Sequence, residues 1–393
     1  MKTVWVLDHY ARPRHQQFAQ LNRHRYRTIR FMSAFINKQP ELGRNKTRVE
    51  QTDYGQVVHL RTFSYDANNW RRSLNMVSFA VQVVMRAFRR PRPDVVVASG
   101  PHLFTLAAGM VVAWLRRAHL VVEVRDFWPR SLVDLNALRP AALSTRLLYR
   151  LERWSYAAAD GIIFSMPKGN LYLHELGLDK ETCVIPNGVA RALAEDTSVV
   201  PVELAGNYPF VAMYSGLLGV ANNVDIILEA AAILSIKHPG RFGFLLYGYG
   251  QEKERLTQRA RQMDNVHMMD PVPHQQLLAI LRGNADATLF TLRSVDVFKY
   301  GVSPNKIADY LAAAKPLVFS CNAGNDVAVL AGCGISVPPD DPEALAEALV
   351  QLAEMPQQQR QEMGQRGYKY LLENYILEDH ARLFGDFVLS QGS

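Results

Sequence analysis

Short apolar runs alternate with amphipathic stretches along almost the whole chain. Runs such as Val4–Asp8 and Asp94–Ser99 indicate buried strands, whereas apolar residues at three- and four-residue spacing, as in Leu103–Arg116, predict helices. Parallel sheets that are covered by helices on both faces produce this alternation. The pattern therefore predicts an α/β fold built on parallel sheets.

The alternation is interrupted once, at Pro186-Asn187-Gly188 and through residues 190–209, and then restarts. A chain of 393 residues is long enough for two domains of about 190 residues each. We predict doubly wound domains over residues 1–190 and 191–370, with a C-terminal helix in 371–393 that could cross back to the first domain. The ligand loops would then line an interdomain cleft.

Two local predictions concern the start of the chain. Residues 8–27 contain many basic and aromatic side chains and no glycine, and we expect a long polar loop there. A helix is expected to follow over residues 27–37. Such a loop could contact an acceptor molecule or nucleic acid, or it could simply be solvated.

Composition narrows the class of protein. With 48% hydrophobic and 21% charged residues the chain is globular, and its three cysteines lack metal-ligand spacing. We therefore expect a reducing compartment and neither disulfides, a metal nor a cofactor. The strand-like start offers no signal peptide, and the uncharged run Leu103–Leu115 is too short to span a bilayer, so a cytoplasmic location is expected.

Charge is distributed unevenly between the two halves. Residues 1–190 contain 28 Lys+Arg and 14 Asp+Glu, whereas residues 191–393 contain 16 and 23. A basic half suggests contact with a polyanionic surface. No motif that reads RNA or DNA accompanies the charge, so nucleic acid is not expected. The helix predicted over residues 73–88 is flanked by arginines and could lie on an anionic membrane, or it could pack on the first sheet with solvated ends.

The segment Tyr300–Phe319 combines a loop, a helix and a buried strand. Ser303 is a suitable N-cap, and Pro304 suits the first helical position. A helix N-terminus with Lys306 in its first turn attracts phosphate, and Asp309 could accept hydrogen bonds from sugar or ribose hydroxyls. The alternative is a surface helix with a local Lys306–Asp309 ion pair.

Two glycine loops follow predicted strands. Gly216 and Gly219 would let the backbone approach a ligand, or they would form a tight turn without one. Gly248 and Gly250 begin a dinucleotide-binding pattern, but Lys253 occupies its third glycine position, and NAD binding is discounted.

The segment Val121–Leu132 changes abruptly from apolar to polar at a strand end. Arg125 and Asp126 could contact a substrate, and Trp128 could form a wall for a sugar ring. The alternative is a surface corner with Trp128 in the core. The chain contains no nucleophile elbow, HExxH or P-loop, so hydrolase and ATPase functions lack support.

Five segments together resemble a retaining glycosyltransferase of family 4 with the GT-B fold. They are RDFWPRSL, PNGV, YSGLLGVANNVDIILEAAAIL, LLYGYGQEKERL and FKYGVSPNKIADYLAAAKPLV. The likeness is strongest to the WbuB-like branch of bacterial O-antigen, capsule and exopolysaccharide transferases. The resemblance implies two Rossmann-like domains facing across a cleft, an acceptor-binding N-terminal half and a C-terminal half that binds a nucleotide-diphosphate sugar, with a UDP-sugar favoured.

The resemblance also implies roles for individual residues. The acceptor side comprises Arg27, Arg125, Asp126 and Trp128, and Asp126 and Lys306 are the candidate catalytic residues. Residues implied in nucleotide-sugar binding are Gly216, Gly219, Asn222, Gly248, Gly250, Arg293, Lys299, Gly301, Ser303, Pro304, Asn305, Lys306 and Asp309. Asp309 matches the second acid of the family's E-x7-E motif, whereas Gly301 replaces the first acid and Ala314 replaces a usual glycine.

These residues lead to the expectation of a glycosyltransferase that extends a lipid-linked glycan at the inner face of the cell membrane. Two alternatives remain open at this point. One is a GT-B sugar-nucleotide epimerase, and the other is a non-catalytic protein that binds a nucleotide sugar.

Overall fold

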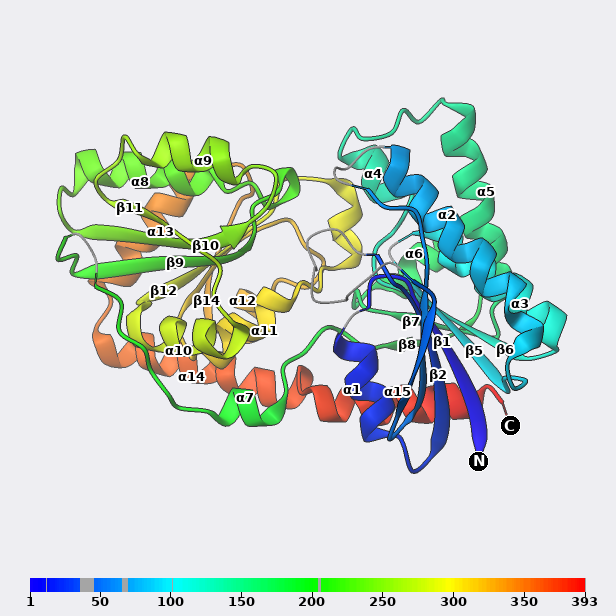
Figure 1. The fold of residues 1–393 in the computed structure, drawn as a ribbon. Coiled ribbons are helices and arrows are strands. Elements are labelled where there is room, and N and C mark those ends of the chain that lie inside the picture. The colour runs from blue at the N-terminus through cyan, green and yellow to red at the C-terminus, as the bar shows by residue number, and fades with distance from the viewer. Residues whose placement is uncertain (12, 36–45, 66–69, 101, 204–205, 393) are drawn as a thin grey trace. The chain divides into compact units, whose positions relative to one another are not determined.

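The computed structural model describes residues 1–11, 13–35, 46–65, 70–100, 102–203 and 206–392. The chain folds into two units, each with its own core. Unit 1 comprises Met1–Pro186 and Leu377–Ser393, and unit 2 comprises Asn187–Ile376. Figure 1 shows a sheet with flanking helices in each unit. Among the described residues, no helix is both long and apolar enough to cross a bilayer.

The sheet of unit 1 has eight strands in the order β3-β4-β2-β1-β5-β6-β7-β8. All neighbours pair in parallel except β3, which runs antiparallel to β4 at the edge. The strands are β1 (Lys2–Asp8), β2 (Tyr26–Ser33), β3 (Arg48–Thr52), β4 (Gly55–Leu60), β5 (Val95–Gly100), β6 (His119–Val124), β7 (Gly161–Phe164) and β8 (Glu181–Val184).

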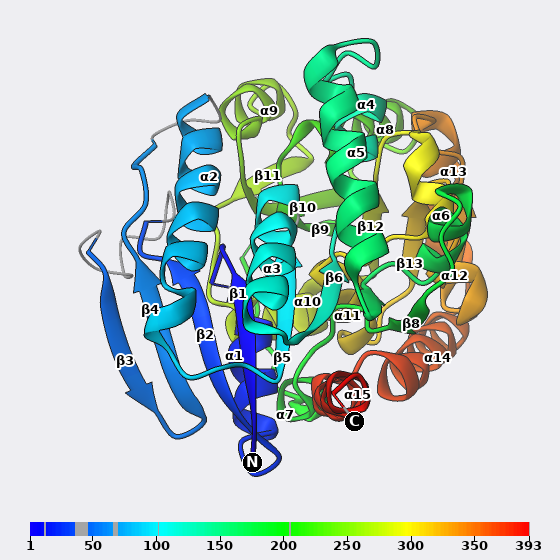
Figure 2. The same ribbon diagram turned by 90° about the vertical axis from the view of Figure 1, so that its right-hand side faces the viewer.

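Helices cover both faces of this sheet. Phe18 of α1 and Phe384 of α15 pack against Val4 and Val97 on one face, so the last helix of the chain completes the first unit. On the other face α2 packs against α3, and α3 against α5 (Figure 2). The elements are α1 (Pro13–Leu21), α2 (Trp70–Met85), η2 (Ala87–Arg89), α3 (Leu103–Arg116), α4 (Arg130–Asp134), α5 (Leu143–Ala158), α6 (Gly169–Glu175) and α15 (Leu377–Ser390).

Unit 2 contains a six-stranded sheet in the order β11-β10-β9-β12-β13-β14, and every pair is parallel. Its strands are β9 (Phe210–Leu217), β10 (Phe242–Tyr249), β11 (Val266–Met269), β12 (Ala287–Thr291), β13 (Leu317–Ser320) and β14 (Gly334–Val337). The helical elements are α7 (Arg191–Glu195), η3 (Val220–Asn222), α8 (Asp225–Lys237), α9 (Lys253–Ala260), α10 (His274–Asn284), η4 (Asp296–Tyr300), α11 (Asn305–Ala312), α12 (Val327–Leu330), α13 (Pro342–Glu354) and α14 (Gln357–Asn374).

Alternation along β9 creates the two cores of unit 2. Phe210, Ala212 and Tyr214 pack with α8, α9 and α13 on one face. Val211 and Met213 pack with α10, α11 and α14 on the other. Both faces of the sheet are therefore buried, as the near-continuous apolar strands predicted. The predicted doubly wound α/β class is confirmed.

Three local predictions were wrong. Residues 26–33 form β2 and not a helix, because nearly every residue of this strand is buried and no alternation marks it in the sequence. Residues 34 and 35 are not helical either, and residues 36–37 of that predicted helix lie outside the described residues. The predicted polar loop contains α1. The single terminal helix expected over 371–389 is two helices, α14 and α15, separated at Tyr375–Ile376.

Candidate functional site

Helix α11 begins at Asn305, at the carboxyl edge of the unit 2 sheet, without a side-chain cap. The prediction of Ser303 as N-cap was wrong, because Pro304 occupies that position. The Ser303 hydroxyl instead accepts a hydrogen bond of 2.8 Å from the Asn187 backbone N–H. Because no side chain caps this terminus, its partial positive charge is available to an anion.

Lys306 is 6% exposed and lies behind this helix start. Its ammonium group donates to Asn222 Oδ1 at 2.9 Å and to the Tyr214 hydroxyl at 3.3 Å. It also lies 4.6 Å from the ring centroid of Tyr214 and 4.8 Å from that of Phe290. The described residues place no carboxylate within ion-pair distance of it.

Burial lowers the pKa of Lys306 from 10.5 to about 7. The physical cause is loss of hydration of the ammonium group, for which two neutral oxygens and two aromatic faces compensate only in part. An incoming anion would supply the missing counter-charge and restore the protonated form. The geometry therefore suits a phosphate or diphosphate group.

The two predicted glycine loops are neighbouring strand ends. Gly216 pairs with Gly248, so these two glycines lie within β9 and β10 and not in loops that follow the strands. A Cβ on Gly248 would lie 2.4 Å from the Gly216 carbonyl oxygen, and one on Gly250 would lie 2.2 Å from that of Leu218. Glycine is therefore required at positions 248 and 250, because the backbone of residues 216–218 approaches them closely.

At Gly216 and Gly219, by contrast, an added Cβ would meet no atom closer than 3.4 Å. Gly216 has φ +147°, and an added Cβ would lie 3.4 Å from Lys306 Cδ. At Gly219 a Cβ would meet no atom closer than 3.5 Å, so the fold itself leaves room for a side chain. A Cβ at Gly219 would lie 3.7 Å from Nδ2 of Asn222, the residue that accepts a hydrogen bond from Lys306.

Arg293 holds the turn that carries Asn222. Its Nε donates to the Val220 carbonyl at 2.9 Å, and its backbone N–H donates to that of Ala221. Lys299 lies on η4 and forms a 3.1 Å ion pair with Asp296. Gly301 ends η4 with φ 98°, a conformation that favours glycine. Arg293 thus connects to Lys306 through the turn, whereas Lys299 has an acidic partner of its own.

Asp309 is 7% exposed and accepts a 2.7 Å hydrogen bond from His274 Nε2. This bond raises the pKa of His274. The alternative of a local Lys306–Asp309 ion pair was wrong, since the two side chains bind different partners. No pattern in the sequence pointed to His274, which begins α10 and meets α11 only through packing.

At the end of α11, Ala314 adopts φ 53°. This left-handed conformation follows the helix C-cap, where glycine is usual because it carries no Cβ. The replacement that the sequence showed at this position therefore keeps the backbone geometry of a glycine.

In unit 1, Arg125, Asp126 and Trp128 directly follow β6 at the carboxyl edge of its sheet. Burial raises the pKa of Asp126 to about 6. Arg27 lies elsewhere. It is exposed near the start of β2, at the opposite edge of the sheet, so the structure does not bring it to the other candidate acceptor residues.

A buried charged cluster lies near Asp126 at the ends of β1 and β6. His15 of α1 lies 2.6 Å from Glu123 and 3.2 Å from Asp8. Arg14 lies 3.1 Å from Glu123, and Arg30 lies 2.6 Å from Asp8. The sequence analysis missed this cluster because it expected a loop without a helix over residues 8–27. The ion pairs connect α1 to the sheet.

The pKa values in this cluster follow from its charges. Burial lowers the pKa of His15, but the charges of Glu123 and Asp8 outweigh it and raise the value. Burial raises the pKa of Glu123, but His15 and Arg14 hold it well below its ordinary range. The two carboxylates are therefore ionised at neutral pH, and they favour the protonated form of His15.

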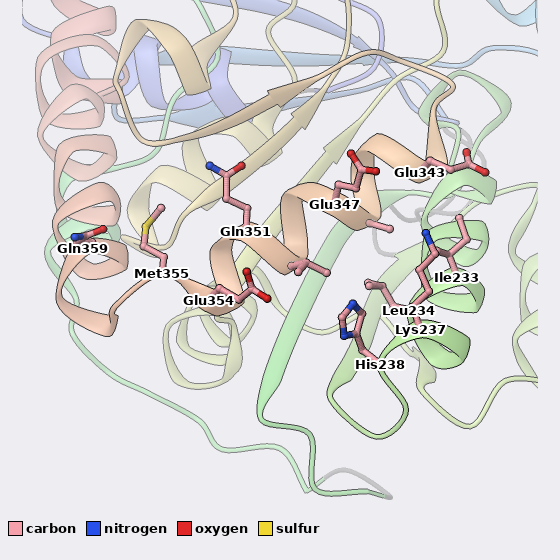
Figure 3. Close-up of a pocket in the computed structure, with 12 residues that line it drawn as sticks. Ile233, Leu234, Lys237, His238, Glu343, Glu347, Gln351, Glu354, Met355 and Gln359 are labelled. Atoms are coloured by element: carbon pink, nitrogen blue, oxygen red, sulfur yellow. The ribbon is translucent and has the colours of Figure 1, made fainter.

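A groove of about 560 Å³ lies in unit 2 between α8 and α13 (Figure 3). Lys237 and His238 come from the end of α8, and Glu343, Glu347 and Glu354 come from α13. None of the residues around Lys306 lines it. The groove is therefore separate from the strand-end site.

Two family models match the chain. Residues 13–188 match "Glycosyl transferase 4-like domain", and residues 209–355 match "Glycosyl transferases group 1". The chain is similar to the probable glycosyltransferase WbjE of Pseudomonas aeruginosa, with 23% identity over 294 residues and 70% of each chain covered. It is also similar to the putative colanic acid biosynthesis glycosyl transferase WcaI of Escherichia coli (strain K12), with 24% identity and 73% of each covered.

Solved structures share the fold at low identity. Sucrose-phosphate synthase from Thermosynechococcus elongatus superposes with a TM-score of 0.74 and 15% identity, with 99% of each chain covered. A structure described as trehalose-6-phosphate from E. coli bound with UDP-2-fluoro glucose superposes with a TM-score of 0.75 and 12% identity, covering 100% of this chain and 99% of the other.

The two Rossmann-like units and these matches define the class of protein, a GT-B glycosyltransferase. The first region matches a glycosyltransferase 4-like domain and the second a glycosyltransferase group 1 domain, and the chain is a transferase enzyme. The predicted GT-B fold and the predicted enzyme class are confirmed.

Proposed function

We propose that this enzyme transfers a sugar, with retention of anomeric configuration, from a nucleotide-diphosphate sugar to a lipid-linked glycan in bacterial surface polysaccharide synthesis. The observation that carries the donor half of this proposal is Lys306. It is a buried ammonium group with no carboxylate partner among the described residues, and it lies at an uncapped helix start beside Gly216.

A diphosphate leaving group fits this environment. As the glycosidic bond breaks, negative charge develops on the diphosphate, and fixed positive charge that is shielded from water stabilises it. Lys306 and the first amides of α11 supply that charge, while Asn222 orients the ammonium group. Asp309, held by His274, binds the ribose. No metal and no further cofactor is required by this scheme.

A UDP-sugar is the favoured donor, and the E. coli neighbour titled with UDP-2-fluoro glucose supports that choice by analogy of fold. Asp126 is the proposed orienting residue on the acceptor side, together with Arg125 and Trp128. A pKa of about 6 lets its carboxyl accept or donate a hydrogen bond near neutral pH.

The proposed acceptor rests on similarity to relatives, and the proposed location at the membrane rests on the charge of the N-terminal half. The similarity to WcaI, which is described as a colanic acid biosynthesis transferase, favours the polysaccharide branch. The basic N-terminal half favours the inner face of the cell membrane, as the sequence suggested.

A thermal-shift screen with UDP, GDP, dTDP and ADP tests the donor half. One nucleotide should raise Tm by mass action, and Lys306→Met should reduce that shift. The matched control is Lys237→Met, on the groove between α8 and α13. If no nucleoside diphosphate shifts the wild-type protein, or if the shift of Lys306→Met equals that of wild type, the donor assignment fails.

A product assay then separates transfer from the alternatives. A transferase needs an acceptor to turn over, whereas an epimerase converts the donor alone, and a binding protein releases no product with any acceptor. Sugar incorporated into a lipid-linked acceptor, with the anomeric configuration read by NMR, is the expected result.

A further inference from the structure

Helix α2 and the turn η2 expose a regular apolar stripe. Six large side chains recur at spacings of three and four residues along one side, namely Trp70, Leu74, Val77, Val81, Met85 and Phe88. Trp70 is 69% exposed, and Met85 and Phe88 are each 67% exposed. The opposite side of α2 is buried through Met76, Phe79 and Val83. The helix is therefore apolar on two sides, and only one of them faces the core.

Helix α5 repeats this arrangement. Leu143, Leu147 and Trp154 lie four and seven residues apart and are exposed, whereas Thr145, Ser155 and Tyr156 are buried. Between these helices lies α3, which exposes Trp114 to 78%. The three helices form one layer on one face of the unit 1 sheet (Figure 2). Exposed apolar residues on this layer therefore do not occur singly, as surface residues normally do.

The charges of this layer have one sign. Residues 70–93, 103–117 and 143–158 contain eleven arginines and one acidic residue, Glu152, which is buried. Six of the arginines are Arg71, Arg72, Arg86, Arg89, Arg90 and Arg92, around the α2 stripe. A second copy of the same surface would repel such a charge, whereas anionic lipid would attract it.

A groove at the end of this layer adds an apolar recess. It has a volume of about 740 Å³ and is lined mostly by apolar side chains, among them Met110, Trp114 and Ala158, with Arg117 and Asp160 beside them. Its dimensions and apolar lining suit a hydrocarbon chain.

We propose that the outer face of α2, η2, α3 and α5, here called the helical face, docks on the surface of an anionic lipid bilayer. Apolar side chains enter the boundary between headgroups and acyl chains, tryptophans lie at that boundary, and arginines bind lipid phosphates. The proposal deepens the membrane association that the proposed function assumes, because it assigns a particular surface.

The helical face also reaches the carboxyl edge of the unit 1 sheet. Arg72, in the first turn of α2, donates to the hydroxyl of Tyr10 at 3.0 Å, and Tyr10 follows β1 directly. A bilayer on the helical face would therefore bring lipid phosphates to the edge where Asp126 lies. A lipid-linked acceptor could then present its headgroup without leaving the membrane.

Vesicle flotation of the full chain tests the proposal. We expect binding to phosphatidylcholine vesicles that contain phosphatidylglycerol, weak binding to phosphatidylcholine alone, and a decline as salt rises. The double variant Val81→Glu/Met85→Glu should weaken binding at least about tenfold. Arg146→Gln/Arg150→Gln on α5 should weaken it about 25-fold, from about fivefold for each arginine. Ile236→Glu on α8, at a position that is 81% exposed, is the matched control and should bind as wild type.

The nucleotide-induced thermal shift serves as the folding readout and should be the same in all of these proteins. If wild type does not float with phosphatidylglycerol vesicles while the nucleotide shift persists, the helical face is not a membrane surface and the donor site is unaffected. Equal binding of wild type and both double variants would overturn the assignment as well. So would a dimer in sedimentation that Val81→Glu/Met85→Glu converts to monomer, since that result would make the face a contact between copies.

Discussion

The side-chain oxygen of Asn222 accepts a 2.9 Å hydrogen bond from the ammonium group of Lys306. The two residues are 84 positions apart, one on the turn after β9 and the other in the first turn of α11. This bond holds the buried ammonium group of Lys306 in position beside the turn. The partner is a neutral amide, and no carboxylate of the described residues pairs with the charge. The positive charge of Lys306 is therefore not neutralised in the ligand-free protein.

Replacement of Lys306 by methionine should separate stability from binding. A buried ammonium group without a counter-ion destabilises the ligand-free protein, so Lys306→Met should raise its Tm. The same change should weaken nucleoside diphosphate binding about 10- to 100-fold, because a hydrogen-bonded charge is lost. Differential scanning fluorimetry and isothermal titration calorimetry measure the two effects. A lower Tm for the variant would show that the ammonium group is adequately compensated in the free protein.

The lowered pKa of Lys306 predicts proton uptake on binding. In the free protein the group is largely neutral above its pKa of about 7. An incoming diphosphate favours the charged form, so at pH 8.5 binding should take up close to one proton, whereas at pH 6 this residue should take up none. Calorimetry in buffers of different ionisation enthalpy measures the number. Uptake that persists in Lys306→Met would assign the proton to another group.

The same shift has a stability consequence. The folded-state pKa of Lys306 lies below the unfolded value of 10.5, so the unfolded chain binds more protons between about pH 7 and 10.5. The destabilisation from this residue is therefore complete below pH 7 and is relieved as pH rises. The difference in free energy of unfolding between Lys306→Met and wild type should shrink over that interval.

Gly219 and Gly248 should respond differently to alanine. Gly248→Ala places a Cβ 2.4 Å from the Gly216 carbonyl oxygen and should destabilise the fold by about 2–3 kcal/mol. Gly219→Ala meets nothing closer than 3.5 Å and should leave stability unchanged or slightly higher, yet weaken nucleotide binding. Urea unfolding with nucleotide titration distinguishes the two. Undiminished binding in Gly219→Ala would remove this loop from the donor site.

Asp309 should recognise ribose hydroxyls. Wild type is expected to bind UDP about tenfold more tightly than 2′- or 3′-deoxy-UDP, since one hydrogen bond to a charged group is lost. Asp309→Asn should discriminate much less, and His274→Gln should lie between them because it keeps the carboxylate but alters its partner. Affinities for the three nucleotides complete the cycle. Equal discrimination by wild type and Asp309→Asn would place Asp309 outside the ribose contact.

His15 should be a structural residue whose effect depends on pH. His15→Phe leaves Asp8 and Glu123 buried with fewer partners and should cost about 3–5 kcal/mol in urea unfolding. Because the folded pKa of His15 is raised, its stabilisation is complete below about pH 6.5 and is lost as pH rises through the folded value. The cost should therefore be larger at pH 6 than at pH 9. The exposed His24→Phe is the control and should stay within about 0.5 kcal/mol of wild type.

The sequence by itself determined the α/β class, because buried parallel strands and amphipathic helices leave distinct periods in the order of residues. Helix α3 was predicted over Leu103–Arg116, with the bounds that the structure gives it. The sequence also predicted Lys306 as a phosphate-binding residue, because the start of a helix can be recognised from neighbouring residues alone.

Only the tertiary structure decided how these residues are partnered. β2 escaped prediction because it is buried on both faces and has no alternating pattern. Asp309 and His274 are hydrogen-bonded although they lie 35 positions apart in the sequence, and His15 and Glu123 are paired although they lie 108 positions apart. Hydrogen bonds and burial act through space, so no local pattern could reveal that Lys306 is buried beside a neutral amide or which apolar side of α2 is exposed.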